Sequence, residues 1–105
     1  MEQEKKDLNE QVTEIEAKVC DFFALTYKEV YSKNLKRDLV LARHFMIYIL
    51  HTHYGISAHA LSKIYNHSAR HIKRICASIR NYIQFDKKYK NYYECLMVYI
   101  KREAN

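Results

Sequence analysis

Apolar side chains recur at alternating spacings of three and four residues along most of the chain. This period places them on one face of an α-helix, so it predicts helices that pack on a core through that face. Helices are predicted over about residues 3–24, 27–32, 39–54, 58–65 and 87–102, and over a segment that follows Ser68 and reaches Ile83. Val, Ile and Thr do not alternate with polar residues as they would in a strand. The predicted fold class is therefore all-α, a small bundle of about six helices.

Residues that favour helix ends mark several of these boundaries. Thr26, Ser57 and Ser68 each precede a predicted helix, where a side-chain oxygen accepts a hydrogen bond from a free backbone N–H. Asp38 is predicted to do the same for the helix over 39–54, and Gly55 is predicted to end that helix. Since the 105 residues contain one Gly and no Pro, few other turns are expected.

The apolar face of each later helix is expected to form the core. These faces comprise Leu39, Ala42, Phe45, Met46, Ile49 and Leu50; Ala60, Leu61, Ile64 and Tyr65; Ile72, Ile75, Cys76, Ile79, Tyr82 and Ile83; and Tyr89, Tyr92, Tyr93, Leu96, Met97 and Ile100. Tyr92 and Tyr93 cannot both point inward, because neighbours on a helix diverge. Cys20, Cys76 and Cys95 lie at apolar positions without C-x-x-C spacing, so they are predicted to be buried thiols in a reducing cytoplasm.

The first apolar stripe comprises Leu8, Val12, Ile15, Val19 and Phe22, and it leaves two interpretations open. In one, a single long helix packs its C-terminal half on the core. In the other, residues 8–22 form the interface of a homodimeric coiled coil, and the chain is a protein-interaction module whose positive field binds an acidic partner. Residues 1–14 are predicted to be an N-terminal helical extension of a domain over residues 15–105.

Charge is unevenly distributed along the chain. The net charge is +6, but the first 18 residues carry −3, and residues 33–80 hold nine Lys or Arg against one acid, Asp38. Positive charge this concentrated favours a phosphate-bearing partner, through counterion release and long-range attraction. No apolar run is long enough to cross a membrane, and no stretch joins a basic face to an exposed apolar one, so a membrane is not an expected partner.

The segment from residue 57 to residue 83 has the pattern of a helix-turn-helix: a short helix, a tight turn at Asn66–His67 and a longer helix. In this motif the second helix enters the major groove of DNA, and its N-terminus favours the approach of a phosphate. The candidates for contact with base edges and phosphates are Ser68, Arg70, His71, Lys73 and Arg74. The pattern therefore predicts binding to double-stranded DNA.

A second basic element precedes the third predicted helix. Residues 32–38 lack helical periodicity and are predicted to form a loop. The candidates for contact with a DNA backbone or minor groove are Lys33, Asn34, Lys36 and Arg37 in this loop, and Arg43 and His44 on the polar side of the next helix. Two separated basic elements are expected to straddle a groove of one duplex.

Roughly residues 15–100 resemble the C-terminal DNA-binding domain of the bacterial replication initiator DnaA. The resemblance is carried by Val19, Phe22 and Phe23 in a V-x-x-[FY]-[FY] helix start, Val30-Tyr31-Ser32-Lys33 for L-L-S-K, Leu41-Ala42-Arg43 for part of A-R-x-R, and Ser57, Leu61, Ser62 and Tyr65 in the first helix of the pair. It implies a fold of the DnaA C-terminal or Trp-repressor-like type, and a regulatory role in bacterial replication or transcription. It also implies that Arg43 takes the role of the family's helix-start Arg and that Arg37 matches a basic loop position.

The chain departs from the family's pattern in the elements that contact DNA. Ser68-Ala69-Arg70-His71 stands where the family has D-H-[ST]-T, Asn34-Leu35 replaces a double Arg in the loop, and the Pro that opens the next helix is missing. Contacts with phosphates are expected to survive these changes, whereas recognition of the family's usual AT-rich box is expected to be altered. The chain also lacks the G-x-x-x-x-G-K-[ST] phosphate loop of the initiator's ATPase module, so a stand-alone DNA-binding protein is expected.

Catalytic and metal chemistry find little support in the sequence. His51 and His53 diverge on a helix, and His67 lies in a turn while His71 lies in a helix, so no metal site is predicted. Acids are scarce after residue 18, and no nucleophile has an evident base beside it. We therefore expect a cytoplasmic DNA-binding protein with no cofactor and no small-molecule substrate, rather than an enzyme.

Overall fold

The computed structural model describes residues 8–31 and 36–103, and 85% of the structure is helical. Its helices are α1 (Leu8–Phe23), α2 (Tyr27–Tyr31), α3 (Arg37–Thr52), α4 (Ala58–Tyr65), α5 (Ala69–Phe85) and α6 (Lys87–Glu103). The described residues contain no strand. The predicted all-α bundle of about six helices is confirmed.

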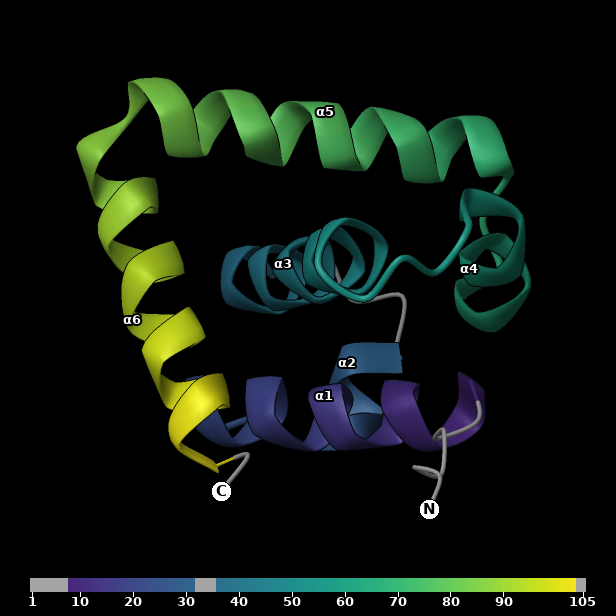
Figure 1. Cartoon of the computed structure of the whole chain (residues 1–105), viewed down its shortest axis with the longest axis horizontal. Coiled ribbons are helices and arrows are strands. Elements are labelled where there is room, and N and C mark those ends of the chain that lie inside the picture. The colour runs from purple at the N-terminus through teal and green to yellow at the C-terminus, as the bar shows by residue number, and fades with distance from the viewer. Residues whose placement is uncertain (1–7, 32–35, 104–105) are drawn as a thin grey trace, which may run out of the picture.

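Four helices form a frame around α3. α5 and α1 lie along opposite sides of the frame, α4 and α6 close its two ends, and α3 passes through the middle, with α2 between α3 and α1 (Figure 1). Six consecutive residues of α3, from Phe45 to Leu50, are each at most 8% exposed. A helix that is apolar all round its circumference must be covered on every side. α3 is therefore the centre of the core, and it is buried more completely than its single predicted face required.

The apolar stripe of α1 packs inside this core. Val12, Ile15 and Val19 are at most 5% exposed, Phe22 is half-buried and only Leu8 is largely exposed. Because the three central residues of the stripe are already covered by the chain's own helices, they are not available to a second copy. The interpretation of residues 8–22 as a dimer interface is not supported, and the alternative of a single helix packed on the core is the one observed.

The two ends of α3 differ from the prediction. The helix begins at Arg37, and the N-cap residue is Lys36, which makes no side-chain capping hydrogen bond. Asp38 therefore lies within the first turn, and its prediction as N-cap is wrong; Lys36 is exposed, so water can reach the first backbone N–H groups. The helix ends at Thr52, and Gly55 follows in the left-handed conformation, with φ +68.

One predicted core residue, Tyr82, lies largely at the surface. The stripe of α5 is buried at Ile72, Ile75, Cys76 and Ile79, but Tyr82 is 47% exposed. In the last turns of α5 the neighbouring helix is α6, which covers only part of the stripe, and the Tyr82 ring stacks on Tyr89 of that helix with ring centroids 4.7 Å apart. The prediction that Tyr82 is buried is wrong because the helical period cannot show how much of the stripe a neighbouring helix covers.

A buried acid joins α1 to α2 and α4. Glu16 is only 5% exposed, and its carboxylate accepts hydrogen bonds from the hydroxyls of Tyr31 and Tyr65; the Tyr65 bond is 2.7 Å long. The two tyrosine rings stack, with centroids 5.6 Å apart and planes within 11°. Burial first, and then Glu16, raises the pKa of both hydroxyls, so both remain protonated donors. The group fixes the last residue of α4, just ahead of the turn to α5.

Candidate nucleic-acid interface

Two serine caps and one left-handed residue set the geometry of the α4–turn–α5 unit. The Ser57 and Ser68 hydroxyls accept hydrogen bonds from the N–H groups of Ala60 (3.1 Å) and His71 (3.0 Å), so both predicted N-caps are confirmed. Asn66 has φ 57 and ψ 46, and the N–H of His67 donates to the carbonyl of Ser62 at 3.0 Å. Asn is one of the few residues that adopt this conformation at low cost. α4 therefore ends sharply, and α5 begins three residues after Asn66, at Ala69.

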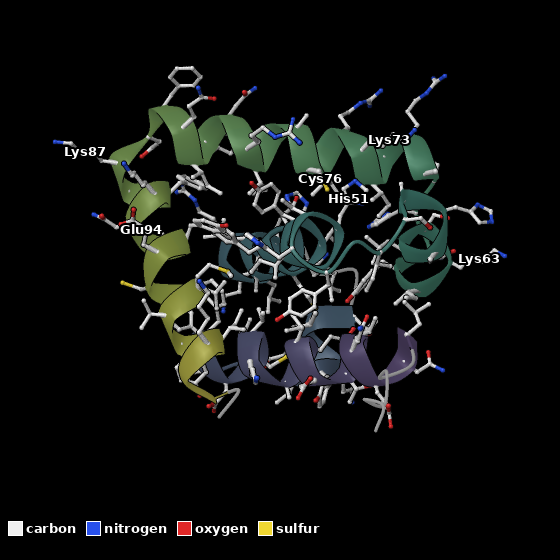
Figure 2. All side chains as sticks on the ribbon, viewed as in Figure 1. His51, Lys63, Lys73, Cys76, Lys87 and Glu94 are labelled. Carbon is white, nitrogen blue, oxygen red and sulfur yellow. The ribbon has the colours of Figure 1, made fainter. Side chains whose placement is uncertain are left out.

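The basic residues of α5 divide between two flanks of the helix. Arg70, Lys73 and Arg74 are all exposed, as predicted. At 100° per residue, Arg70 and Arg74 lie about 40° apart, whereas Lys73 lies on the other side of Arg70 and close to the direction of Arg80. Figure 2 shows Lys73 pointing away from the bundle, whereas Cys76, one turn later, points toward α3. The first two turns of α5 thus present a ridge of two arginines, with Lys73 beside it.

The N-terminal half of α3 brings further cationic side chains to the start of α5. Arg43 and His44 are half-buried, and His67 and His71 meet with ring centroids 4.6 Å apart. Burial, and then the positive charges of His71, Arg43 and His67, lower the pKa of His44 to about 4. Burial also lowers the pKa of Arg43. With this pKa the His44 imidazole is uncharged near pH 7, whereas the Arg43 guanidinium keeps its charge. We call these four residues the cationic cluster; it joins α3 to the turn and the first turn of α5.

The basic loop is only partly within the described residues. Lys33 and Asn34 lie outside them. Lys36 and Arg37 are exposed at the start of α3, and Arg37 lines a groove of about 410 Å³ together with His44 of the cationic cluster. We call this the α3–α5 groove; its other lining residues are Val40, Leu41, Ser78, Ile79, Tyr82 and Tyr89. The structure therefore brings Arg37 and His44 to one surface that continues to the start of α5.

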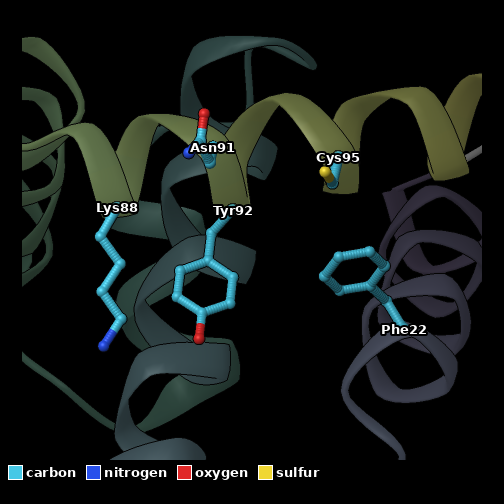
Figure 3. Close-up of a pocket in the computed structure, with 5 residues that line it drawn as sticks. All are labelled: Phe22, Lys88, Asn91, Tyr92 and Cys95. Atoms are coloured by element: carbon cyan, nitrogen blue, oxygen red, sulfur yellow. The ribbon is translucent and has the colours of Figure 1, made fainter.

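A second hollow, of about 330 Å³, lies beside α6, and its lining includes the one cysteine whose predicted burial is wrong. It is lined by Phe22, Lys88, Asn91, Tyr92 and Cys95 (Figure 3). Cys20 and Cys76 are buried as predicted, but Cys95 is exposed, because the core-facing side of α6 is set by the next residue, Leu96. The lining contains no carboxylate or imidazole to act as an acid or base.

The described residues offer no metal site and no membrane span. No three His, Cys, Asp or Glu side chains in that part of the chain come together as a metal ion would need. None of the helices between residues 8 and 103 that the structure describes is both long and apolar enough to cross a bilayer. The described residues instead form a helix pair flanked by exposed arginine and lysine side chains.

His44 gives the fold a testable pH dependence. The pKa of its imidazole is about 4 in the folded chain and about 6.5 when unperturbed, so between these values the unfolded state binds more protons and stability falls as pH falls. The wild-type chain should lose more stability than His44→Gln when the pH falls from 7 to 4. The expected difference in unfolding free energy is roughly 2 kcal/mol, after allowance for the hydrated part of the ring. Urea denaturation of both proteins across this range measures the difference, and parallel pH profiles would contradict it.

Comparison with known proteins assigns the family. A model of the bacterial dnaA protein helix-turn-helix matches residues 12–78, which run from the core stripe of α1 through the first half of α5. A comparison with curated proteins finds no match. Helix-turn-helix domains of the matched family are non-catalytic and bind double-stranded DNA in replication initiation. The chain belongs to the bacterial DnaA helix-turn-helix family and is a DNA-binding domain of that type.

Proposed function

We propose that this domain binds double-stranded DNA with a sequence preference, and that the first two turns of α5 enter the major groove. Arg70 and Arg74 are exposed side by side there, within reach of base edges. His71, whose backbone is held by the Ser68 cap, lies beside them at the positive end of the helix. Lys73, on the other flank, is assigned to a phosphate, and the Ser68 hydroxyl, which accepts from His71, can still donate its own proton to one.

The N-terminal half of α3 and the segment before it are assigned to the DNA backbone. Arg43 and His44 contribute to the cationic cluster beside the start of α5, while Lys36 and Arg37 extend the positive surface to the start of α3. Lys33 and Asn34 belong to the same proposed contact by their place in the sequence. The observation that carries the proposal is the packing of α3 on α5, in which Arg37 and His44 line one groove with residues of α5, because it lets two basic elements reach one duplex.

The preferred duplex is expected to differ from the family's usual box. Ser68-Ala69-Arg70-His71 occupies the place of D-H-[ST]-T at the start of the recognition helix, so other donors meet the bases. Arg pairs best with guanine, through O6 and N7. We assign the domain to residues 15–105, with residues 1–14 as its extension, and propose a role in regulating replication or transcription at sites that this altered element selects.

Selection of bound duplexes from a random pool at moderate salt tests the function. Arg70→Ala is expected to relax the preference at particular base pairs and to cost about tenfold in affinity for the selected site. Arg43→Ala is expected to weaken binding to every duplex alike and to lower the slope of log K against log salt by about one. Arg80→Ala, an exposed arginine of α5 on the other flank, is the control and should leave the preference unchanged. No enrichment of any sequence, or unchanged affinity in both test variants, would contradict the proposal.

A further inference from the structure

The α3–α5 groove combines aromatic rings with basic side chains in a way that the helix pair does not use. Arg37 and His44 line it from α3, Tyr82 lines it from α5 and Tyr89 from α6, and aliphatic side chains complete the lining. Its volume of about 410 Å³ is in the range of pockets that hold small organic groups. Tyr82 was expected in the core, and its exposure gives the groove an aromatic wall.

That wall is held rigidly from behind. Tyr82 and Tyr89 stack at a centroid distance of 4.7 Å with planes within 27°, and Tyr89 in turn lies 6.4 Å from the fully buried ring of Phe45. Tyr89 covers one face of the Tyr82 ring, and Tyr82 is still 47% exposed and lines the groove. Phe85, three residues further along α5, is 78% exposed and does not line the groove. A ring fixed before binding loses little conformational freedom when a ligand stacks on it.

The surroundings of the groove carry positive charge. Arg37 is exposed at one side of the groove, whereas Lys88 of α6 lines the separate hollow around Phe22 and Cys95. No carboxylate lines the groove, and the sequence from residue 39 to residue 93 contains one acid, Asp86, whose carboxylate accepts the backbone N–H of Lys88 at 2.9 Å. An aromatic wall with a guanidinium at its side matches a ligand that has a flat ring and an anion in one unit.

We propose that the α3–α5 groove binds an unpaired nucleotide of single-stranded DNA, with its base stacked on Tyr82 and its phosphate beside Arg37. Bases within a duplex stack on each other and offer no free face, so a stacking wall selects unpaired strands. Because His44 belongs both to the groove and to the cationic cluster, a strand that leaves a duplex bound at α5 reaches the groove directly. The site lies outside the recognition helix's first turns, so this inference goes beyond the proposed function.

Fluorescence anisotropy of a labelled oligothymidine of about ten nucleotides tests the groove on the full chain. Tyr82→Ala is expected to weaken binding about tenfold, whereas Tyr82→Phe, which keeps the ring, stays within about twofold. Phe85→Ala, which removes an exposed aromatic ring of α5 outside the groove lining, should change affinity less than twofold. The control is Tyr54→Ala: this tyrosine is 38% exposed but lies beyond the C-terminal end of α3, opposite to Arg37, and its loss should change affinity less than twofold.

A duplex titration of the same variants separates the two proposals. Tyr82→Ala should leave duplex affinity within about twofold, while Arg37→Ala should lower the salt slope for the single strand by about 0.7. If the wild-type chain binds duplex but no single strand, or if Tyr54→Ala and Tyr82→Ala weaken the single strand equally, the groove is not the site and duplex binding stands. If it binds the single strand through Tyr82 but no duplex, the proposed function fails instead. Binding of an acidic peptide in place of the single strand would overturn the inference and assign the groove to a protein.

Discussion

Replacing Glu16 by alanine is expected to lower the free energy of unfolding by about 3 kcal/mol. The carboxylate is 5% exposed and is the acceptor for the hydroxyls of Tyr31 and Tyr65. Removing it leaves the Tyr65 hydroxyl buried without this acceptor, and Tyr65 itself is only 9% exposed. The Met46 sulfur, 3.1 Å from the Tyr65 hydroxyl, is only a weak acceptor, so the buried hydroxyl still costs about 1–3 kcal/mol, and the space left by the Glu16 side chain adds to this. The loss is large for a domain of this size.

Urea denaturation followed by circular dichroism measures this loss, and two further variants assign it to the hydrogen bonds. Glu16→Gln keeps an acceptor oxygen and should retain most of the stability. Tyr65→Phe removes one donor and keeps the stacked ring, so it should cost about 1 kcal/mol. The double variant Glu16→Ala/Tyr65→Phe should be less destabilised than the sum of the two single changes, because both remove the same bond. Additive losses, or a Glu16→Ala protein as stable as the wild type, would show that the carboxylate does not hold α1 to α4.

Reversing the charge of Arg70 and Arg74 together is expected to reduce affinity for the selected duplex by at least about 100-fold. Both side chains are exposed in the first two turns of α5, on the flank that adjoins His71 and the cationic cluster. Each substitution removes a favourable contact with the DNA, and each new glutamate is repelled by the phosphates. The effect should shrink as salt rises, because screening weakens the attraction and the repulsion alike.

The matched control reverses two charges of the same helix on its other flank. Lys73→Glu/Arg80→Glu changes the net charge of the domain by the same amount, so long-range attraction falls equally in both proteins. We expect about tenfold weaker binding in this control, from the loss of that attraction and of a phosphate contact at Lys73. Gel-shift titrations at two salt concentrations compare the pair. Equal losses of affinity in the two proteins would mean that only total charge matters, and would contradict the proposal that α5 enters the major groove.

Most of the fold could be predicted from the sequence because its signals are local. The bounds of α4 agree with the prediction residue for residue, since Ser57 marks its start and Asn66 closes it. The same holds for the start of α5 at Ser68. These ends depend on hydrogen bonds between residues three to five apart, which a linear pattern contains. The start of α3 was predicted less well, because Asp38 favours a cap but does not occupy that position.

The candidate interface was predictable as a set of residues but not as a surface. Charge counts and spacing indicate Arg70, Lys73 and Arg74, and the helical period separates their two flanks, but which flank adjoins α3 depends on how the helices pack. The sequence also contained no sign that Arg37 and His44 of α3 line one groove with residues of α5, since the two helices are far apart along the chain and adjoin only through packing.

What this chain's sequence determined by itself is the helical bundle, the helix pair and the excess of positive charge, because period, caps and composition act over a few residues. Only the tertiary structure decided the environment of single side chains. It buried Glu16, which a helix stripe would leave in solvent, by bringing Tyr31 and Tyr65 to it as donors. It exposed Tyr82, which the stripe would bury, because α6 covers only part of the residue through Tyr89. Burial is a property of neighbours, and neighbours are set by how whole helices pack.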